Sequence, residues 1–379
     1  MLQRPIPPID FLNPRSIAVF VCILQGAIFA ALLLRRWSRT RKSSDYWLAV
    51  LLLVLISSLI TPFIGFANVY DNNQWLTYFP FTIAYSYGAL VWLYTANLLD
   101  PKRRFEARDL LLFVPSLIYV AIRLALFAQS LEWKDWFGET FGRAFSAFIF
   151  VTELVWNLTF LTFSILLYRR YRRWLDENYS DTEKMKFDWL RNFLYFFAAV
   201  IALGAAFDFV NSFVVRLSYI QFFYFEIVLA LATYALAIAG YLRSEPIGID
   251  FESVQKAEDV PGRQKLMNAD ELDRHKVRLM KLISSDQPYL DPQLTLGDLA
   301  KSLGVNGAVL SFVINNGFGK NFNDFINEFR IDDVKSRITE RPSDSLLAIA
   351  FDCGFNSKAT FNRAFRKFTG STPKQFQSK

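Results

Sequence analysis

The chain of 379 residues has little of what most enzymes and metal sites require. Its only histidine, His275, excludes histidine-dependent triads within one chain and multi-histidine metal sites. Its two cysteines, Cys22 and Cys353, fall in unlike regions, which argues against a structural disulfide. The run Gly317-Phe-Gly319-Lys320 lacks the spacing of a phosphate-binding loop. We therefore expect no enzyme, no catalytic residue, no metal and no cofactor.

Long apolar runs are abundant, but in only part of the chain. Residues 16–242 are rich in Phe, Leu, Ala, Ile and Val, whereas residues 243–379 resemble a soluble, charged protein. The chain holds 39 phenylalanines and a formal net charge of +7. This division predicts a lipid-facing part followed by a soluble part.

Seven runs are long enough to cross a bilayer, which needs about 20 mostly apolar residues. They lie at about 16–34, 46–66, 78–99, 110–128, 144–167, 192–215 and 220–242. Short polar loops separate them, so seven membrane spans are favoured over buried helices of a soluble protein. The fold class predicted is all-α, a seven-helix transmembrane bundle over residues 1–242.

Basic residues in alternate loops indicate how the spans are oriented, because Lys and Arg collect on the cytoplasmic side. The loops at 35–45, 100–109 and 168–191 are basic, and the loops at 67–77 and 129–143 are poor in Lys and Arg. The N-terminus is therefore expected outside, with residue 243 onward in the cytoplasm.

Several polar residues fall inside the predicted spans, where each charge costs about 2.5–3.5 kcal/mol at a helix centre. They lie in the outer half of the bundle, and they are Arg123, Glu153, Asn157, Asp208, Asn211 and Glu226. One hypothesis is a polar cavity, open to the outside, that senses a small ligand or a proton. The alternative is that Arg123 pairs with one or two carboxylates and holds the helices in register, or that its side chain snorkels outward.

Residues 243–268 carry Pro246, Pro261 and Gly262 without apolar periodicity, which predicts a cytoplasmic linker. Residues 269–284 return to helical spacing. This helix either dimerises or packs on the domain that follows, and His275 is expected on its surface.

Two similar patterns follow the linker. In residues 295–316, Thr295 and Asn306 suit helix N-caps and Gly304 suits the turn between two helices. A long amphipathic helix at about 321–339 separates this unit from a second one at 345–369. Both units have the pattern of a helix-turn-helix.

The second pattern carries the most specific signal in the chain. It reads Ile349-Ala-Phe-Asp-Cys-Gly-Phe-Asn-Ser357, followed by Phe361, Phe365-Arg-Lys367 and Thr369-Gly-Ser-Thr-Pro373. Residues 280–378 thereby resemble the AraC/XylS family of bacterial transcription regulators, and the whole chain resembles members with seven membrane spans. The resemblance implies two recognition helices that enter successive major-groove segments about 34 Å apart.

The resemblance also assigns roles to particular residues. Those implied to read bases are Lys358, Asn362 and Arg363 in the second unit and Ser311 in the first. Those implied to contact the DNA backbone are Asn306, Ser357, Thr360, Arg366 and Lys367. The first unit departs from the pattern because Ala308 and Phe312 cannot donate a side-chain hydrogen bond, so it is expected chiefly to position the protein.

Together these features predict a membrane-embedded, one-component, sequence-specific transcription regulator. Its domains would be a membrane sensor at 1–242, a linker at 243–268 and a DNA-binding domain at 269–379. Its expected location is the bacterial cytoplasmic membrane, and its expected partners are double-stranded DNA, the lipid bilayer, an unknown small ligand or proton, and a second copy of the chain. The alternative is a transporter or membrane enzyme with a regulatory DNA-binding tail.

Overall fold

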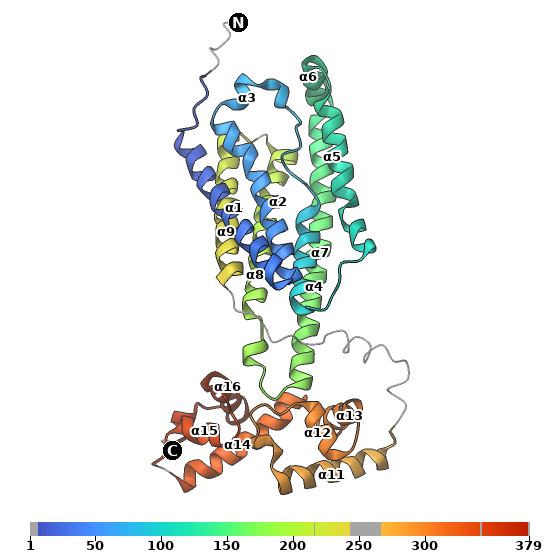
Figure 1. Ribbon diagram of the computed structural model, residues 1–379, viewed down its shortest axis with the longest axis vertical. Helices are drawn as coiled ribbons and strands as arrows, with labels where there is room; N and C mark the ends of the chain where they lie inside the picture. Colours follow the sequence, from blue (N-terminus) through green and yellow to red (C-terminus); the bar gives the residue numbers. More distant parts are fainter. Residues whose placement is uncertain (1–6, 216, 243–266, 342, 378–379) are drawn as a thin grey trace. The chain divides into compact units, whose positions relative to one another are not determined.

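The computed structural model describes residues 7–215, 217–242, 267–341 and 343–377 (Figure 1). These residues are predominantly α-helical, and the extended pairing among them is an isolated antiparallel bridge between Tyr179 and Thr295. The predicted all-α class, apolar helices followed by helix-turn-helix units, is confirmed. The predicted linker at 243–268 lies outside the described residues except for its last two.

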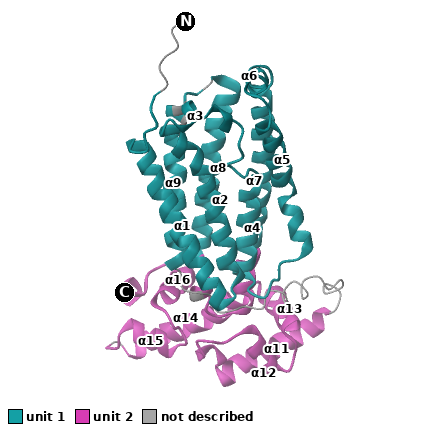
Figure 2. Cartoon of the chain, turned by 45° about the horizontal axis from the view of Figure 1, so that its top comes forward, with its two compact units in different colours: residues 1–168, 188–249 teal, residues 169–187, 250–379 magenta. Residues whose placement is uncertain are grey.

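The chain divides into two compact units, coloured separately in Figure 2. Unit 1 comprises residues 1–168 and 188–249, and unit 2 comprises residues 169–187 and 250–379. A segment from the middle of the sequence thus belongs with the C-terminal region.

Unit 1 is a bundle of helices. They are α1 (Pro14–Thr40), α2 (Ser43–Phe66), α3 (Val69–Asn72), η1 (Gln74–Leu76), α4 (Ser86–Leu99), η2 (Ala107–Phe113), α5 (Val114–Phe127), α6 (Leu131–Thr140), most of α7 (Gly142–Asn178), α8 (Asp188–Phe209), the π-helical η4 (Val210–Val214) and α9 (Tyr219–Leu242). Arg36 fastens one end of the bundle: its guanidinium donates to Asp45 at 2.5 and 2.7 Å and to the Tyr241 carbonyl at 2.8 Å. These bonds join α1, α2 and α9.

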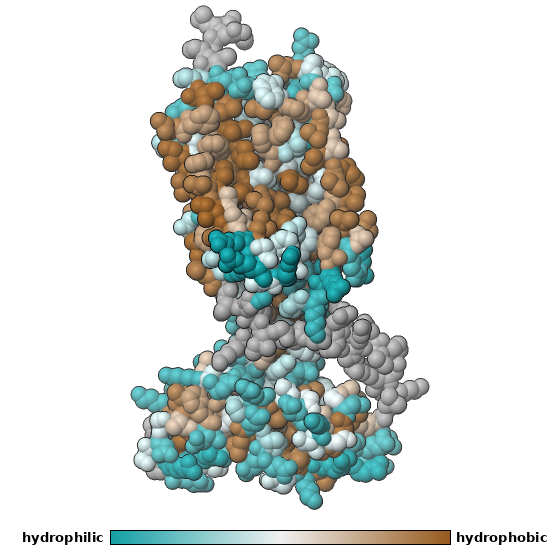
Figure 3. All heavy atoms as spheres, viewed as in Figure 1, coloured by the Kyte–Doolittle hydropathy of each residue, from teal (hydrophilic) through white to brown (hydrophobic). Residues whose placement is uncertain are grey.

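Six described helices are long and apolar enough to cross a membrane, judged by length and composition. They are Pro14–Thr40, Ser43–Phe66, Ala107–Phe127, Gly142–Asn178, Asp188–Val214 and Phe223–Leu242. Large apolar side chains are exposed on their outer faces, for example Leu117, Phe148 and Val155. Figure 3 shows hydrophobic residues over much of the visible face of unit 1. An apolar surface of this extent is typical of contact with lipid or another protein.

The expected third span, 78–99, is helical only from Ser86 to Leu99. Pro80 disfavours helix in the residue before it, and Tyr78 and Tyr85 adopt positive φ angles of 72° and 67°. Most of α4 is buried inside unit 1. The hydropathy of this run was therefore that of a short core helix with an irregular lead-in.

Unit 2 holds the end of α7 (residues 169–178), η3 (Glu183–Met185) and a series of C-terminal helices. These are α11 (Ala269–Asp286), η6 (Pro288–Leu290), α12 (Leu296–Leu303), α13 (Gly307–Phe318), α14 (Phe322–Glu340), α15 (Leu346–Asp352), α16 (Lys358–Thr369) and α17 (Pro373–Gln377). One hydrophobic core joins α11, α12 and α13, and another joins α15 and α16. Helix α14 contributes Phe325 and Ile326 to the first core and Ile331 and Val334 to the second, so it links the two.

Candidate functional site

Local sequence signals produce the two helix-turn-helix units. Thr295 and Asp298 form a capping box at the start of α12, and the Asn306 side chain accepts from the Val309 amide at 2.8 Å to begin α13. Gly304 adopts φ 72° in the turn between them. We call α12 and α13 the first unit.

The second unit, α15 and α16, repeats this construction with Ser345 and Ser357 as N-caps. Its turn glycine, Gly354, adopts φ 87°. A Cβ at this position would lie 2.3 Å from the carbonyl oxygen of Tyr289, so only glycine fits. The second unit is thereby seated against the η6 turn.

Arg330 of α14 lies between the first and second helix-turn-helix units and is fully buried. Its guanidinium donates to the carbonyls of Tyr289 and Asp291, each at 2.7 Å, and to the Ser180 hydroxyl at 3.1 Å. Burial lowers the pKa of Arg330 to about 10, so it still carries a charge at neutral pH. The sequence pattern gave no signal for this role, because an arginine in a charged helix is normally on the surface.

Helix α16 presents a basic outward face. Thr360, Phe361, Ala364 and Phe365 are buried, and this leaves Lys358, Asn362 and Arg366 exposed one turn apart on the opposite side. These three side chains bond to none of the residues that the structure describes.

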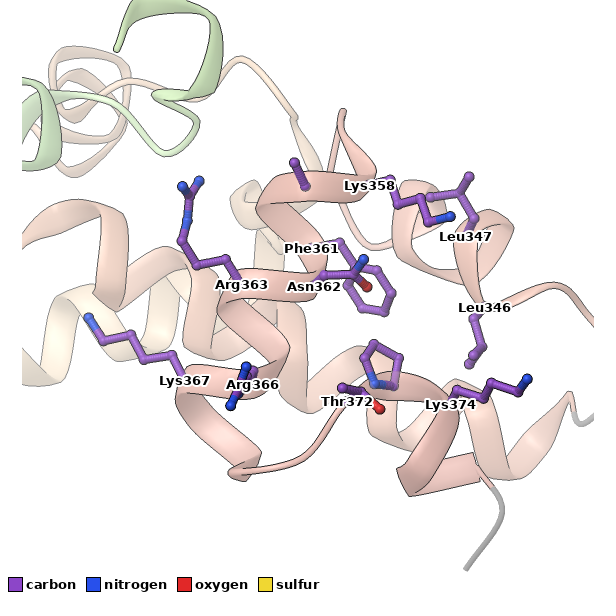
Figure 4. Close-up of a pocket in the computed structure, with 12 residues that line it drawn as sticks. Leu346, Leu347, Lys358, Phe361, Asn362, Arg363, Arg366, Lys367, Thr372 and Lys374 are labelled. Carbon is purple, nitrogen blue, oxygen red and sulfur yellow. The ribbon is translucent and has the colours of Figure 1, made fainter. Parts of the chain in front are cut away.

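An open groove of about 960 Å³ runs along this face of α16 (Figure 4). Among the described residues, its lining includes five basic side chains and no acidic one. The basic ones are Lys358, Arg363, Arg366, Lys367 and Lys374. In Figure 4, Lys358 and Lys374 lie on one side of the groove, and Arg363 and Lys367 extend to the other.

The remaining residues expected at DNA are already engaged within unit 2. Arg363 pairs with Glu183, and Lys367 contacts Asp324 at 2.6 Å. The Thr360 hydroxyl is buried and donates to Asp181 at 3.1 Å. The Thr360 hydroxyl is thus engaged by Asp181, and its expected contact with a DNA backbone stays a prediction.

The outward face of α13 carries mainly neutral side chains. Ala308, Ser311 and Phe312 are half-buried there, and Asn315 is exposed beside them. The Asn315 amide donates to the Ser311 hydroxyl at 3.3 Å. Asn315 was missed in the sequence, although its position one helical turn after Ser311 places it on the same face.

Unit 1 contains a separate cavity of about 310 Å³. It is lined by four of the six polar residues expected there, Glu153, Asn157, Asp208 and Glu226, with Tyr87, Phe150 and Phe225 among the aromatic walls. The other two lie elsewhere: Arg123 stands over the Tyr78 ring at 5.1 Å, and Asn211 accepts from the Leu217 amide at 3.0 Å.

The cavity is acidic, because no Lys or Arg is among its described lining residues. Asn157 has a structural bond as well, since its side chain accepts from the Gly88 amide of α4 at 2.9 Å. One carboxylate oxygen of Glu226 is buried without a hydrogen-bond partner among the described residues.

Comparison with known proteins agrees with the geometry of unit 2. Residues 299–379 match a family model described as a helix-turn-helix domain. Unit 2 contains a helix-turn-helix domain.

The relatives share only this part of the chain. An uncharacterized HTH-type transcriptional regulator of Staphylococcus aureus strain COL is 34% identical over 89 residues, and proteins of the same description in strains MSSA476 and N315 match equally. The match covers 24% of this chain and 12% of each relative's length. A solved structure of a protein of unknown function from Listeria innocua is 24% identical, covers 27% of this chain and 93% of its own, and has a TM-score of 0.25.

Proposed function

We propose that the chain is a membrane-embedded, one-component transcription regulator of the AraC/XylS type. The observation that carries this proposal is the groove along α16, with five basic residues and no acidic one, on a helix-turn-helix domain. Duplex DNA is the polyanion that such a helix fits, because a recognition helix lies in the major groove between two phosphate strands.

The exposed side chains suit distinct parts of the duplex. Lys358 and Arg363 suit guanine and Asn362 suits adenine, whereas Arg366 and Lys367 suit phosphates. Ser311 and Asn315 offer the first unit's hydrogen-bonding groups. The N-caps Asn306 and Ser357 stand at helix N-termini, where backbone amides suit phosphate oxygens.

Unit 1 is proposed to lie in the bacterial cytoplasmic membrane. Its six long apolar helices and exposed apolar side chains support this location. The basic loops then face the cytoplasm. Residues 78–99, as α4 and its irregular lead-in, supply a seventh crossing beside the six long helices. This odd number puts the N-terminus outside and unit 2 on the side where DNA is found.

The acidic cavity of unit 1 is proposed as the sensor, for a small ligand or a proton. Glu153, Asp208 and Glu226 repel one another in a poorly solvated space, which favours an occupant that brings positive charge. Arg123 and Asn211 are not part of this cavity, so the alternative in which Arg123 neutralises the carboxylates is not supported.

Genome-wide mapping of bound DNA tests the regulator. We expect the intact protein to occupy discrete sites and the Arg363→Ala variant to lose them, with Asp332→Asn as a control on an exposed face of α14. Unchanged occupancy by Arg363→Ala would contradict the proposed readout.

A transcriptional reporter placed at a mapped site tests the sensor. We expect Glu153→Gln, Asp208→Asn or Glu226→Gln to abolish the response to the cue while DNA occupancy persists. A normal response in all three variants would eliminate the cavity as the sensor, and solute flux through the protein would instead support a transporter with a regulatory tail.

A further inference from the structure

The chain between α7 and α8 lies against both helix-turn-helix units. Within it, residues 179–183 form what we call the docking segment. It belongs to unit 2, although more than a hundred residues separate it in sequence from the helices that it contacts. Its polar side chains and loop position predicted only a cytoplasmic connection between two spans.

One end of the docking segment bonds to the first unit. Ser180 is fully buried, its amide donates to the Leu294 carbonyl at 3.3 Å, and its hydroxyl donates to the same carbonyl at 2.8 Å. Tyr179 forms an antiparallel bridge with Thr295, the N-cap of α12.

The same end of the docking segment also bonds to α14. The side-chain amide of Asn323 donates to the carbonyls of Tyr179 and Ser180 at 3.1 and 2.8 Å. The side-chain amide of Asn327 donates to the Ser180 carbonyl at 3.3 Å. These bonds join side chains to backbone atoms, so they fix the position of the segment's main chain.

The other end of the docking segment reaches the recognition helix α16. Asp181 accepts from the Thr360 hydroxyl, and the Glu183 carboxylate pairs with Arg363. Two carboxylates thus stand where the proposed function puts DNA phosphates and a guanine. Like charge excludes the phosphate strand from this side of α16 for as long as the segment is docked.

The docked arrangement is suited to release. The Arg363 and Glu183 side chains keep 51% and 29% of their exposure, and a pair of this kind contributes little stability. Arg330 loses only its bond to Ser180 on release, because the carbonyls of Tyr289 and Asp291 still accept from it. Release also breaks the bonds of Ser180 to Leu294, Asn323 and Asn327. The two hydrophobic cores of unit 2, as described, contain no residue of the docking segment, so they stay packed when it leaves.

We propose that the docking segment is an intramolecular competitor of DNA, which must leave α16 before α16 reads the major groove. The inference rests on the proposed function, because it takes α16 as the DNA-reading helix. It gives the membrane helices a route to transcription, since the docking segment is covalently continuous with α7 and α8 and not only with the C-terminal linker.

The test uses the full-length protein in lipid nanodiscs and duplexes selected by that protein from a randomised DNA pool. We expect Glu183→Gln to bind the selected duplex about two- to fivefold more tightly, because the competing carboxylate is removed. Asp332→Asn is the matched control: it also removes an exposed, ion-paired carboxylate of unit 2, and we expect less than about a twofold change.

A charge-neutral variant separates docking from simple electrostatics. Asn323→Ala removes the amide that holds Tyr179 and Ser180 and leaves α16 and the net charge unchanged, so we expect tighter binding here too. If only Glu183→Gln binds the duplex more tightly, the gain is explained by the lost negative charge alone. That result would contradict the proposal that the docking segment competes with DNA.

Hydrogen exchange gives a readout that does not depend on affinity. We expect the Ser180 amide, bonded to Leu294 in the docked state, to exchange faster when the selected duplex is bound. Slower exchange would mean that the segment stays docked on DNA and would overturn the inference. Arg363→Ala distinguishes the two proposals. If this variant keeps full affinity for the duplex, the DNA-reading role of α16 is wrong. If it loses affinity while Glu183→Gln gains none, only the proposal about the docking segment is wrong.

Discussion

The two helix-turn-helix units share one construction and present different side chains to solvent. Each begins with a capped helix, turns at a positive-φ glycine and continues into a helix with an N-cap. The outward face of α13 is neutral, with Ser311 and Asn315, whereas α16 carries Lys358 and Arg366. The comparison teaches that one backbone construction can present unlike surfaces, and that under the proposed function the side chains of each unit decide whether it reads bases.

The largest expected contrast lies in the turns. Gly354→Ala would drive a methyl group into the Tyr289 carbonyl, and we expect a loss of about 2–4 kcal/mol in the free energy of unfolding of unit 2. Gly304→Ala meets nothing within 4 Å, so only the backbone cost of about 1–2 kcal/mol applies. Hydrogen exchange of the α14 amides in the full-length protein measures both. Equal losses of unfolding free energy in the two variants would show that the close contact between Gly354 and the Tyr289 carbonyl of η6 adds nothing to the cost of Gly354→Ala.

The next contrast concerns base reading. We expect Asn362→Ala to weaken binding to a selected duplex by about 1–3 kcal/mol, roughly 5- to 150-fold, because an asparagine that bonds adenine is lost. Ser311→Ala should change the affinity less than about threefold, since Ser311 is half-buried and already bonded to Asn315. Titration of both variants with the same duplex measures the two affinities. A larger loss of affinity from Ser311→Ala would show that the first unit, and not the second, is the main base reader.

Salt dependence sharpens the comparison further. If Arg366 contacts a phosphate, Arg366→Gln lowers the slope of log affinity against log salt concentration by about one. Asn315→Ala in the first unit should leave the slope unchanged, because no charge is removed. Binding measured over a series of salt concentrations tests both variants, and a slope insensitive to Arg366→Gln would remove that side chain from the DNA contacts.

The smallest effect is expected at Cys353, the residue just before the turn glycine Gly354. Leu303 occupies the same place before Gly304 in the first unit. Both are buried, and burial raises the pKa of the Cys353 thiol to about 12. At pH 8 roughly one thiol in ten thousand would be ionised. In a Cys22→Ala background we expect no measurable alkylation of Cys353 until unit 2 unfolds. Rapid labelling under native conditions would mean that the second core opens more readily than its packing implies.

Much of unit 2 follows from its sequence because the signals are local. Thr295, Asn306 and Ser357 are caps whose own side chains each accept from the backbone amide three residues later. Glycine at 304 and 354 is favoured by the positive φ angles of the two turns. The long apolar helices of unit 1 follow from equally local signals, except where the irregular lead-in at Tyr78 and Tyr85 replaces helix.

Features that depend on distant partners were not predictable in this way. Arg123 was grouped with the carboxylates by depth along its helix, but the rotation of each helix decides which side chains meet, and Arg123 meets Tyr78. Ser180 lies in what looks like a loop between spans, and nothing in its neighbours indicates Leu294 or Arg330 as partners.

Arg330 has a consequence for the geometry of the operator. Its buried guanidinium ties η6 to α14, the helix that links the two helix-turn-helix units, and this tie opposes independent movement of the two units. If both units read DNA, as proposed, binding depends on helical phase as well as sequence, because one base pair added between the two half-sites turns the second half-site by about 35° away from α16. The change in affinity caused by that insertion would therefore measure how rigidly Arg330 holds the two helix-turn-helix units.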